Sequence, residues 1–256
     1  MKGFGAYLLL EMRRTVRSVQ FLVFAIGFPL VFYLLFSAMF GAQTLGTVSA
    51  NVYLMVSMGA YGAMGAAINA NSARLAAERT TGWSRDLRVT PLGIGAYTAV
   101  KTVLAFVLAL PGFAVVAAAA VLVHHVAAAR PTWWTSTAAT WLDLFALMWL
   151  GSLPFAVLGV LLGYVFNAES AQAGSMIVYL GLALLGAMWI PIRVMPSTLA
   201  HVALWLPSYR YADLGWRVVA GQPASGADVA ILAAYALGMA VLAGQLYRRD
   251  EARNYA

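Results

Sequence analysis

The feature that most constrains this chain is a series of long apolar stretches that contain almost no charge. Six of them are long enough to cross a bilayer core, which takes about 20 helical residues. Hydrophobic residues make up 62% of the chain and charged residues 10%, against roughly half and a quarter in a soluble domain. The stretches lack two-residue alternation, so helices are expected rather than strands. We therefore predict an all-α integral membrane fold, a single domain over residues 1–256, with six transmembrane helices at 19–40, 52–71, 102–123, 141–166, 170–190 and 229–247.

Basic residues are distributed unevenly among the connecting segments. The segments before the first span, between the second and third, and after the sixth hold twelve of the 16 Lys and Arg residues. Such an excess is typical of cytoplasmic loops. We expect a multi-pass protein of the bacterial inner (plasma) membrane with both termini in the cytoplasm. The net charge of +7 is then a topology signal, and no nucleic-acid partner is expected.

The N-terminal segment has the pattern of an amphipathic helix. Phe4, Leu8 and Met12 share one side of a helical wheel, and basic residues lie opposite. This predicts a helix in the cytoplasmic interface, although Glu11 falls on its apolar side. A plain charged extension of the first span is the alternative.

The polar loop between the second and third spans is the most informative connector. A helical piece is expected to end near Gly82, and a second short helix to run from Trp83 until Pro91 closes it. That helix has one apolar edge and alternating charge, which suits insertion into a groove of another protein. A solvated loop is the alternative.

The segment 191–222 is rich in apolar residues but too interrupted to span. Two short helices, at 197–206 and 208–220, are expected to form an outer re-entrant cap between the fifth and sixth spans. Pro196, Pro207 and Tyr209 mark this cap. Simple surface packing is the alternative.

Two prolines and a glycine motif bear on the spans themselves. Pro29 and Pro154 lie inside spans and are expected to kink or open them. Gly159 and Gly163 form a GxxxG motif, which allows close helix approach.

Chemically active groups are scarce. The chain has no cysteine, and His124 and His125 are adjacent rather than spaced as metal ligands. The stretch Gly95 to Thr102 resembles a phosphate-binding loop except that Val100 replaces its second glycine. We therefore expect no catalytic residue, metal or cofactor in this chain; if a nucleotide drives its function, ATP and Mg would be bound by a partner.

Several of these segments together resemble the ABC-2 family of ABC transporter permeases. The resemblance lies in the Glu78-Arg79…Gly82…Leu87-Arg88…Pro91 loop, in Leu153-Pro154-Phe155 and in the Pro196…Pro207-Ser208-Tyr209 segment. It implies a homo- or heterodimer of permeases with two ABC ATPase subunits, and a cytoplasmic coupling helix between spans two and three. The residues that would contact the ATPase are Glu78, Arg79, Gly82, Trp83, Asp86, Leu87, Arg88 and Pro91.

The predicted function is that of the permease subunit of an ATP-driven exporter, without catalysis of its own. The lack of charge inside the spans favours a hydrophobic or amphipathic cargo such as a drug, antibiotic or lipid, with a role in multidrug or antibiotic resistance. The candidate path is lined by Met55, Met58, Met64, Met176 and Tyr179. The alternatives are a membrane sensor or immunity protein for a membrane-active compound, and a secondary transporter, which usually needs intramembrane charges.

Overall fold

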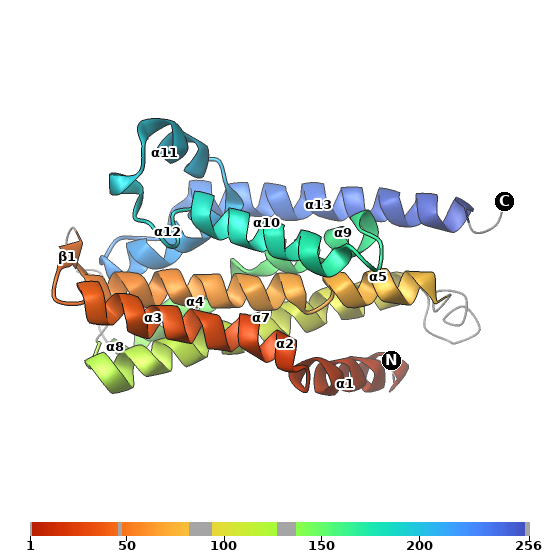
Figure 1. Cartoon of the computed structure of the whole chain (residues 1–256), viewed down its shortest axis with the longest axis horizontal. Coiled ribbons are helices and arrows are strands. Elements are labelled where there is room, and N and C mark those ends of the chain that lie inside the picture. The colour runs from red at the N-terminus through yellow and green to blue at the C-terminus, as the bar shows by residue number, and fades with distance from the viewer. Residues whose placement is uncertain (1, 46–47, 82–93, 127–136, 254–256) are drawn as a thin grey trace.

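The computed structural model describes residues 2–45, 48–81, 94–126 and 137–253. Its long helices run roughly parallel to one axis (Figure 1). Both termini lie at one end, with α1 (Lys2–Val16) and α5 (Ser72–Thr80); we call this the terminal end. The opposite end carries a short antiparallel hairpin of β1 (Thr44–Leu45) and β2 (Val48–Ser49), and we call it the hairpin end.

The first predicted span is helical but irregular. It consists of α2 (Val19–Leu22), a π-helical turn (Val23–Gly27) and α3 (Phe28–Phe40). Pro29 stands in the first turn of α3, where its missing N–H and its ring disturb the regular hydrogen-bond ladder behind it. Ser18 begins α2 by accepting a hydrogen bond from the Phe21 amide, which separates α2 from α1. The predicted disturbance of this span by Pro29 is confirmed.

Helix α4 (Ala50–Asn69) is the centre of the bundle. All of its residues except Asn51, Tyr53 and Asn69 are buried. Its glycines allow this, because a Cβ on Gly62 would lie 2.8 Å from the carbonyl oxygen of Gly112 in the neighbouring helix. Small residues on α4 therefore let other backbones pack directly against it.

The remaining helices surround α4. They are α7 (Ile94–His124), α8 (Thr137–Leu150), α9 (Leu153–Val165), α10 (Ala171–Leu185), α11 (Ser197–Ala203), α12 (Pro207–Val219) and α13 (Gly226–Arg253). Gly159 of α9 approaches α4 so closely that a Cβ would lie 2.6 Å from the Ile68 carbonyl oxygen. Helices α11 and α12 match the two short helices expected in this region.

Within the described residues, four helical runs are long and apolar enough to cross a membrane: Val19–Phe40, Tyr97–His124, Ala138–Val165 and Gly226–Arg249. This agrees with an all-α multi-pass membrane protein. The run Ala138–Val165 is interrupted after Leu150, just ahead of Pro154, as that proline predicted. Helix α10 has 15 residues, which at about 1.5 Å each fall short of a bilayer core about 30 Å thick. The count of six spans stays a prediction.

Two sequence-based boundaries were wrong. The third predicted span begins at Ile94 rather than Thr102, so Lys101 is a helix residue and not part of the connector. The fifth predicted span is helical only to Leu185. Gly186 caps it, and Ala187 takes the left-handed backbone conformation with φ 59°, which ends a helix.

Candidate functional site: a buried charge cluster at the terminal end

Lys101 is completely buried in α7 and joins three helices. Its Nζ lies 2.8 Å from Glu11 of α1 and 3.0 Å from the Glu78 carboxylate of α5. The ammonium also lies 5.3 Å from the ring centroid of Tyr97 and 5.9 Å from that of Tyr7. One side chain thus links α1, α7 and α5, which we call the connector helix because it leads into the loop between the second and third predicted spans.

A buried ammonium is stable only if opposite charges compensate its lost hydration. Arg74 completes the balance, because its Nη1 donates to Glu11 at 3.3 Å and to the Thr15 hydroxyl at 2.8 Å. Glu11, Arg74, Glu78 and Lys101, which we call the charge cluster, therefore carry no net charge when all are ionised. The Tyr97 hydroxyl donates a further hydrogen bond to Glu78.

Glu11 shows how the cluster balances burial against charge. Burial raises the pKa of its carboxyl, but the Lys101 ammonium and the Arg74 guanidinium lower it more, so the net pKa lies below its usual value. The stability that this carboxylate provides is therefore present at neutral pH, and it is lost as pH falls below about 4.5 through the folded-state pKa.

Arg79 attaches the same connector helix to α9. Its Nη1 donates to the backbone carbonyls of Gly163 at 2.9 Å and Tyr164 at 2.8 Å, with a longer contact to Phe166 at 3.4 Å. Its guanidinium carbon lies 5.4 Å from the centroid of the Tyr164 ring. These carbonyls end α9 and have no partner further along that helix. Arg79 therefore caps the C-terminus of α9 from α5.

The structure thus gives two of the predicted coupling residues an internal position. Glu78 faces Lys101, and Arg79 faces α9. Whether they also contact an ATPase stays a prediction. The other predicted coupling residues, Gly82, Trp83, Asp86, Leu87, Arg88 and Pro91, lie outside the described residues. Sequence reasoning missed Lys101 and Glu11 as cluster members; the apolar-side position of Glu11 was the available signal.

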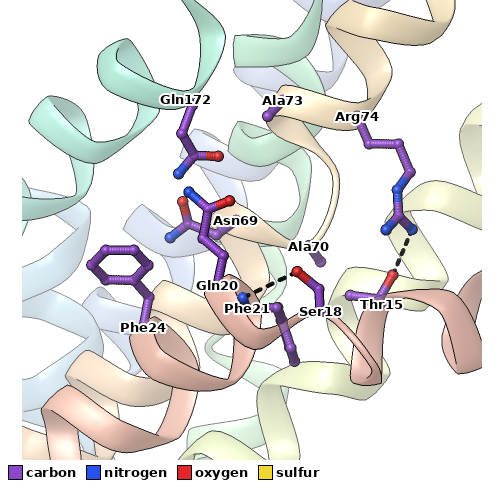
Figure 2. A pocket seen from close by; sticks show the side chains of 10 residues that line it. All are labelled: Thr15, Ser18, Gln20, Phe21, Phe24, Asn69, Ala70, Ala73, Arg74 and Gln172. Carbon is purple, nitrogen blue, oxygen red and sulfur yellow. Dashed lines mark hydrogen bonds between the residues drawn. The ribbon is translucent and has the colours of Figure 1, made fainter.

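A small polar pocket adjoins the charge cluster where α1 turns into α2. It encloses about 120 Å³ between these helices, the α4–α5 junction and the start of α10. Figure 2 shows the carboxamides of Gln20, Asn69 and Gln172 gathered on one side and the Arg74–Thr15 hydrogen bond on the other. The Oδ1 of Asn69 is buried and has no hydrogen-bond partner among the residues that the structure describes. At this volume the pocket suits a small polar group and is below the roughly 300 Å³ of a drug-sized site.

The residues predicted to line a cargo path are tightly packed in this conformation. Met55, Met58 and Met64 are fully buried in α4. Tyr179 of α10 is also fully buried, stacks on Tyr61 with 4.6 Å between ring centroids, and donates to the Tyr61 carbonyl at 3.1 Å. Met176 is half-buried. None of these side chains lines the cavities of about 120, 190, 260 and 350 Å³, and their role in a path stays a prediction.

The residues predicted for an outer cap lie in and beside α11 and α12. Pro196 precedes α11 and is exposed, whereas Pro207 begins α12 and is buried. The Tyr209 ring meets Trp216 edge-on, with 5.8 Å between centroids. Tyr211 is fully buried, and its hydroxyl donates to the Met148 carbonyl at 2.8 Å, which fixes α12 to α8. Among the described residues, no three His, Asp or Glu side chains are placed to hold a metal ion.

Comparison with known proteins identifies the family to which this arrangement belongs. The sequence profile described as "ABC-2 family transporter protein" matches residues 43–244, from the hairpin almost to the end of α13. The chain belongs to the ABC-2 family. This permease is also 29% identical, over 242 residues, to a protein of Bacillus subtilis (strain 168) that carries the provisional name transport permease YvfS. The alignment covers 94% of this chain and 96% of that protein, so the similarity extends over the whole ABC-2 chain.

Proposed function

We propose that this ABC-2 permease is the membrane-spanning subunit of an ATP-driven exporter. Two permease subunits, each with six spans, pair with two ATPase subunits. The ATPases bind ATP and Mg, and this chain binds neither. The position of Lys101 supports that division, because the lysine of the sequence resembling a phosphate loop lies inside α7 with two carboxylates on its ammonium.

The attachment of the connector helix is the observation that carries the proposal. Helix α5 follows the central helix α4 and leads directly into the 82–93 segment. It is held to α1 and α7 through the charge cluster and to α9 through Arg79. A force applied to the connector therefore acts on three other helices at once. This suits a part that receives movement from an ATPase on the terminal end and passes it into the bundle.

The cargo is proposed to be a hydrophobic or amphipathic molecule that leaves at the hairpin end. Its path would open between α4 and α10 of the two subunits, past Met55, Met58, Met64, Met176 and Tyr179. These side chains are apolar or aromatic, and thioethers adapt to varied apolar shapes. Since they are packed in this conformation, the path would open only in another state of the transport cycle.

Co-purification and a charge reversal in the connector test the proposal. The tagged chain, expressed in its own host, should retain an ATPase subunit through detergent extraction. Asp86→Arg should reduce export strongly while the ATPase still hydrolyses ATP. Glu169→Arg is the matched control, because Glu169 is an exposed acid outside the connector. Glu78 is a poor choice for this test, since its reversal would leave three positive charges facing one carboxylate, Glu11, in a buried cluster.

Two results would contradict the proposal. One is export by Asp86→Arg at the wild-type rate. The other is the absence of any ATPase from the purified complex, together with an unchanged response of the host to membrane-active compounds when the permease gene is deleted. Binding of such a compound without ATP-dependent movement would instead favour the sensor or immunity function.

A further inference from the structure

A second cavity, at the hairpin end, has different chemistry from the pocket beside the charge cluster. It encloses about 350 Å³, within the usual range of roughly 300–1,000 Å³ for sites that hold drug-sized ligands. Its walls come from the start of α4, the turn at Ile192–Val194 and one face of α12. Figure 1 shows α12 near the hairpin, away from both termini. We call it the hairpin-end cavity.

One wall of the hairpin-end cavity is aromatic and already fixed in place. The rings of Tyr53 and Trp216 stack with 4.7 Å between centroids and 7° between planes, and Tyr209 meets Trp216 edge-on. The indole Nε1 of Trp216 donates to the Ser57 hydroxyl at 3.1 Å. An apolar or aromatic ligand group can pack on such a wall with little further loss of side-chain freedom.

The charges around the cavity favour an anion. Arg193 lines it, is exposed, and has neither an ion pair nor a hydrogen bond to any residue that the structure describes. Arg217 also lines it; its Nη1 lies 4.0 Å from Asp213, at the limit of an ion pair, and its Nε donates to the Pro223 carbonyl at 3.1 Å. Two guanidinium groups therefore face one carboxylate. The neighbouring Arg210 is already engaged, because it contacts Asp228 at 2.8 Å.

We propose that the hairpin-end cavity binds an amphipathic anion, with its carboxylate or phosphate on Arg193 and Arg217 and its apolar body on Tyr53, Tyr209 and Trp216. This rests on the proposed function in one respect only: if the chain is an exporter, the anion is cargo on its way out. The same chemistry is offered by the headgroup of an anionic phospholipid. Guanidinium groups recognise both through charge-assisted hydrogen bonds.

A matched pair of probes tests the charge preference. Dansyl-labelled undecanoic acid and its methyl ester share an apolar body and differ in the negative charge. Binding to the purified chain in a neutral detergent is followed by energy transfer from tryptophan. We expect the acid to bind about 25- to 100-fold more tightly than the ester, because Arg193 and Arg217 each add a charge-assisted contact worth about five- to tenfold. Equal affinities for the two probes would overturn the proposal.

Single substitutions locate the binding. Arg193→Gln and Arg217→Gln should each weaken acid binding about five- to tenfold and leave ester binding unchanged. Arg248→Gln is the control, because Arg248 is exposed near the C-terminal end of α13. Trp216→Phe removes the indole of the aromatic wall and should reduce the energy transfer. If both arginine variants elute as wild type from size exclusion and bind the acid normally, the site assignment is wrong.

A third measurement distinguishes the two sources of the anion, cargo and a phospholipid headgroup. Acid binding is repeated in nanodiscs with and without phosphatidylglycerol. Competition by this lipid assigns the cavity to a headgroup, whereas unchanged binding assigns it to cargo; either result keeps the anionic class. Because no ATPase or ATP is present, these measurements stand even if the exporter proposal fails.

Discussion

Replacing Lys101 with methionine tests the charge cluster most directly. Methionine keeps an unbranched side chain of similar length but removes the ammonium that contacts both Glu11 and Glu78. Of the contacts described above, Glu11 would keep only the 3.3 Å contact with Arg74. Glu78 would keep only the hydrogen bond from the Tyr97 hydroxyl. Neither carboxylate can turn to water without moving a helix, since their side chains are 6% and 14% exposed.

The expected cost follows from these contacts. Removing one partner of a buried ion pair costs about 3–5 kcal/mol, because the other charge stays buried and uncompensated. Lys101→Met should therefore lower the free energy of unfolding by about that amount at neutral pH. The cost should shrink as pH falls towards about 5, because the unpaired carboxyls can then take up protons.

Unfolding by sodium dodecyl sulfate in mixed micelles, followed by circular dichroism, measures this free energy. Arg14→Met is the control on α1, where an exposed basic residue should change stability by less than about 0.5 kcal/mol. The double variant Glu11→Gln/Lys101→Met removes a negative charge as well and should be more stable than Lys101→Met alone. A Lys101→Met protein within about 1 kcal/mol of wild type would refute the argument.

Three further outcomes are expected. Arg79→Lys should cost about 1–3 kcal/mol in the same unfolding assay, because lysine cannot bridge the α9 carbonyls as the planar guanidinium does. Gly159→Ala should lower the free energy of unfolding by about 1–3 kcal/mol, because its Cβ would collide with the α4 backbone. Gly238→Ala is the control, because Gly238 has open space around it, and it should not lower the stability. Equal losses of stability in the two variants would contradict the close approach of α9 to α4. Burial and the neighbouring Asp228 raise the pKa of Asp213 to about 6. Protonation as pH falls through about 6 should remove the negative charge beside Arg217 and tighten binding of a dansylated alkyl sulfonate, which keeps its own charge over this range. Weaker binding of the sulfonate at about pH 5 than at about pH 7.5 would contradict this. The other charged or titratable groups that face Asp213 are Tyr53, Tyr209, Arg210, Arg217 and Asp228.

Local sequence signals predicted the local structure well. The apolar pattern and Pro154 predicted where the helical run Ala138–Val165 is interrupted, and the two short helices of the 191–222 segment lie close to their predicted positions. These features depend on neighbours in the chain, such as a missing N–H or a capping residue. The short hairpin was not anticipated, because its two-residue strands have no readable periodicity.

The same local reasoning could not predict the charge cluster. Glu11, Glu78 and Lys101 lie far apart in the sequence, and nothing in their local context states that they meet. Lys101 in particular was counted as a loop charge, because hydropathy alone placed the start of the third span after it. The sequence signal for this pair was the unusual position of two charges. Glu11 lies on an apolar helix face, and Lys101 lies beside an apolar run.

The contact between Gly62 and Gly112 determines where the subunit can bend. A Cβ on either glycine would lie 2.7–2.8 Å from the carbonyl oxygen of the other, so α4 and α7 pack backbone to backbone at this point and we expect them to move as one unit. Displacement of α5, which follows α4 in the chain, should then move α7 as well. The deformation must then be absorbed where hydrogen bonding is already irregular, at the π-helical turn Val23–Gly27 and at the interruption between α8 and α9.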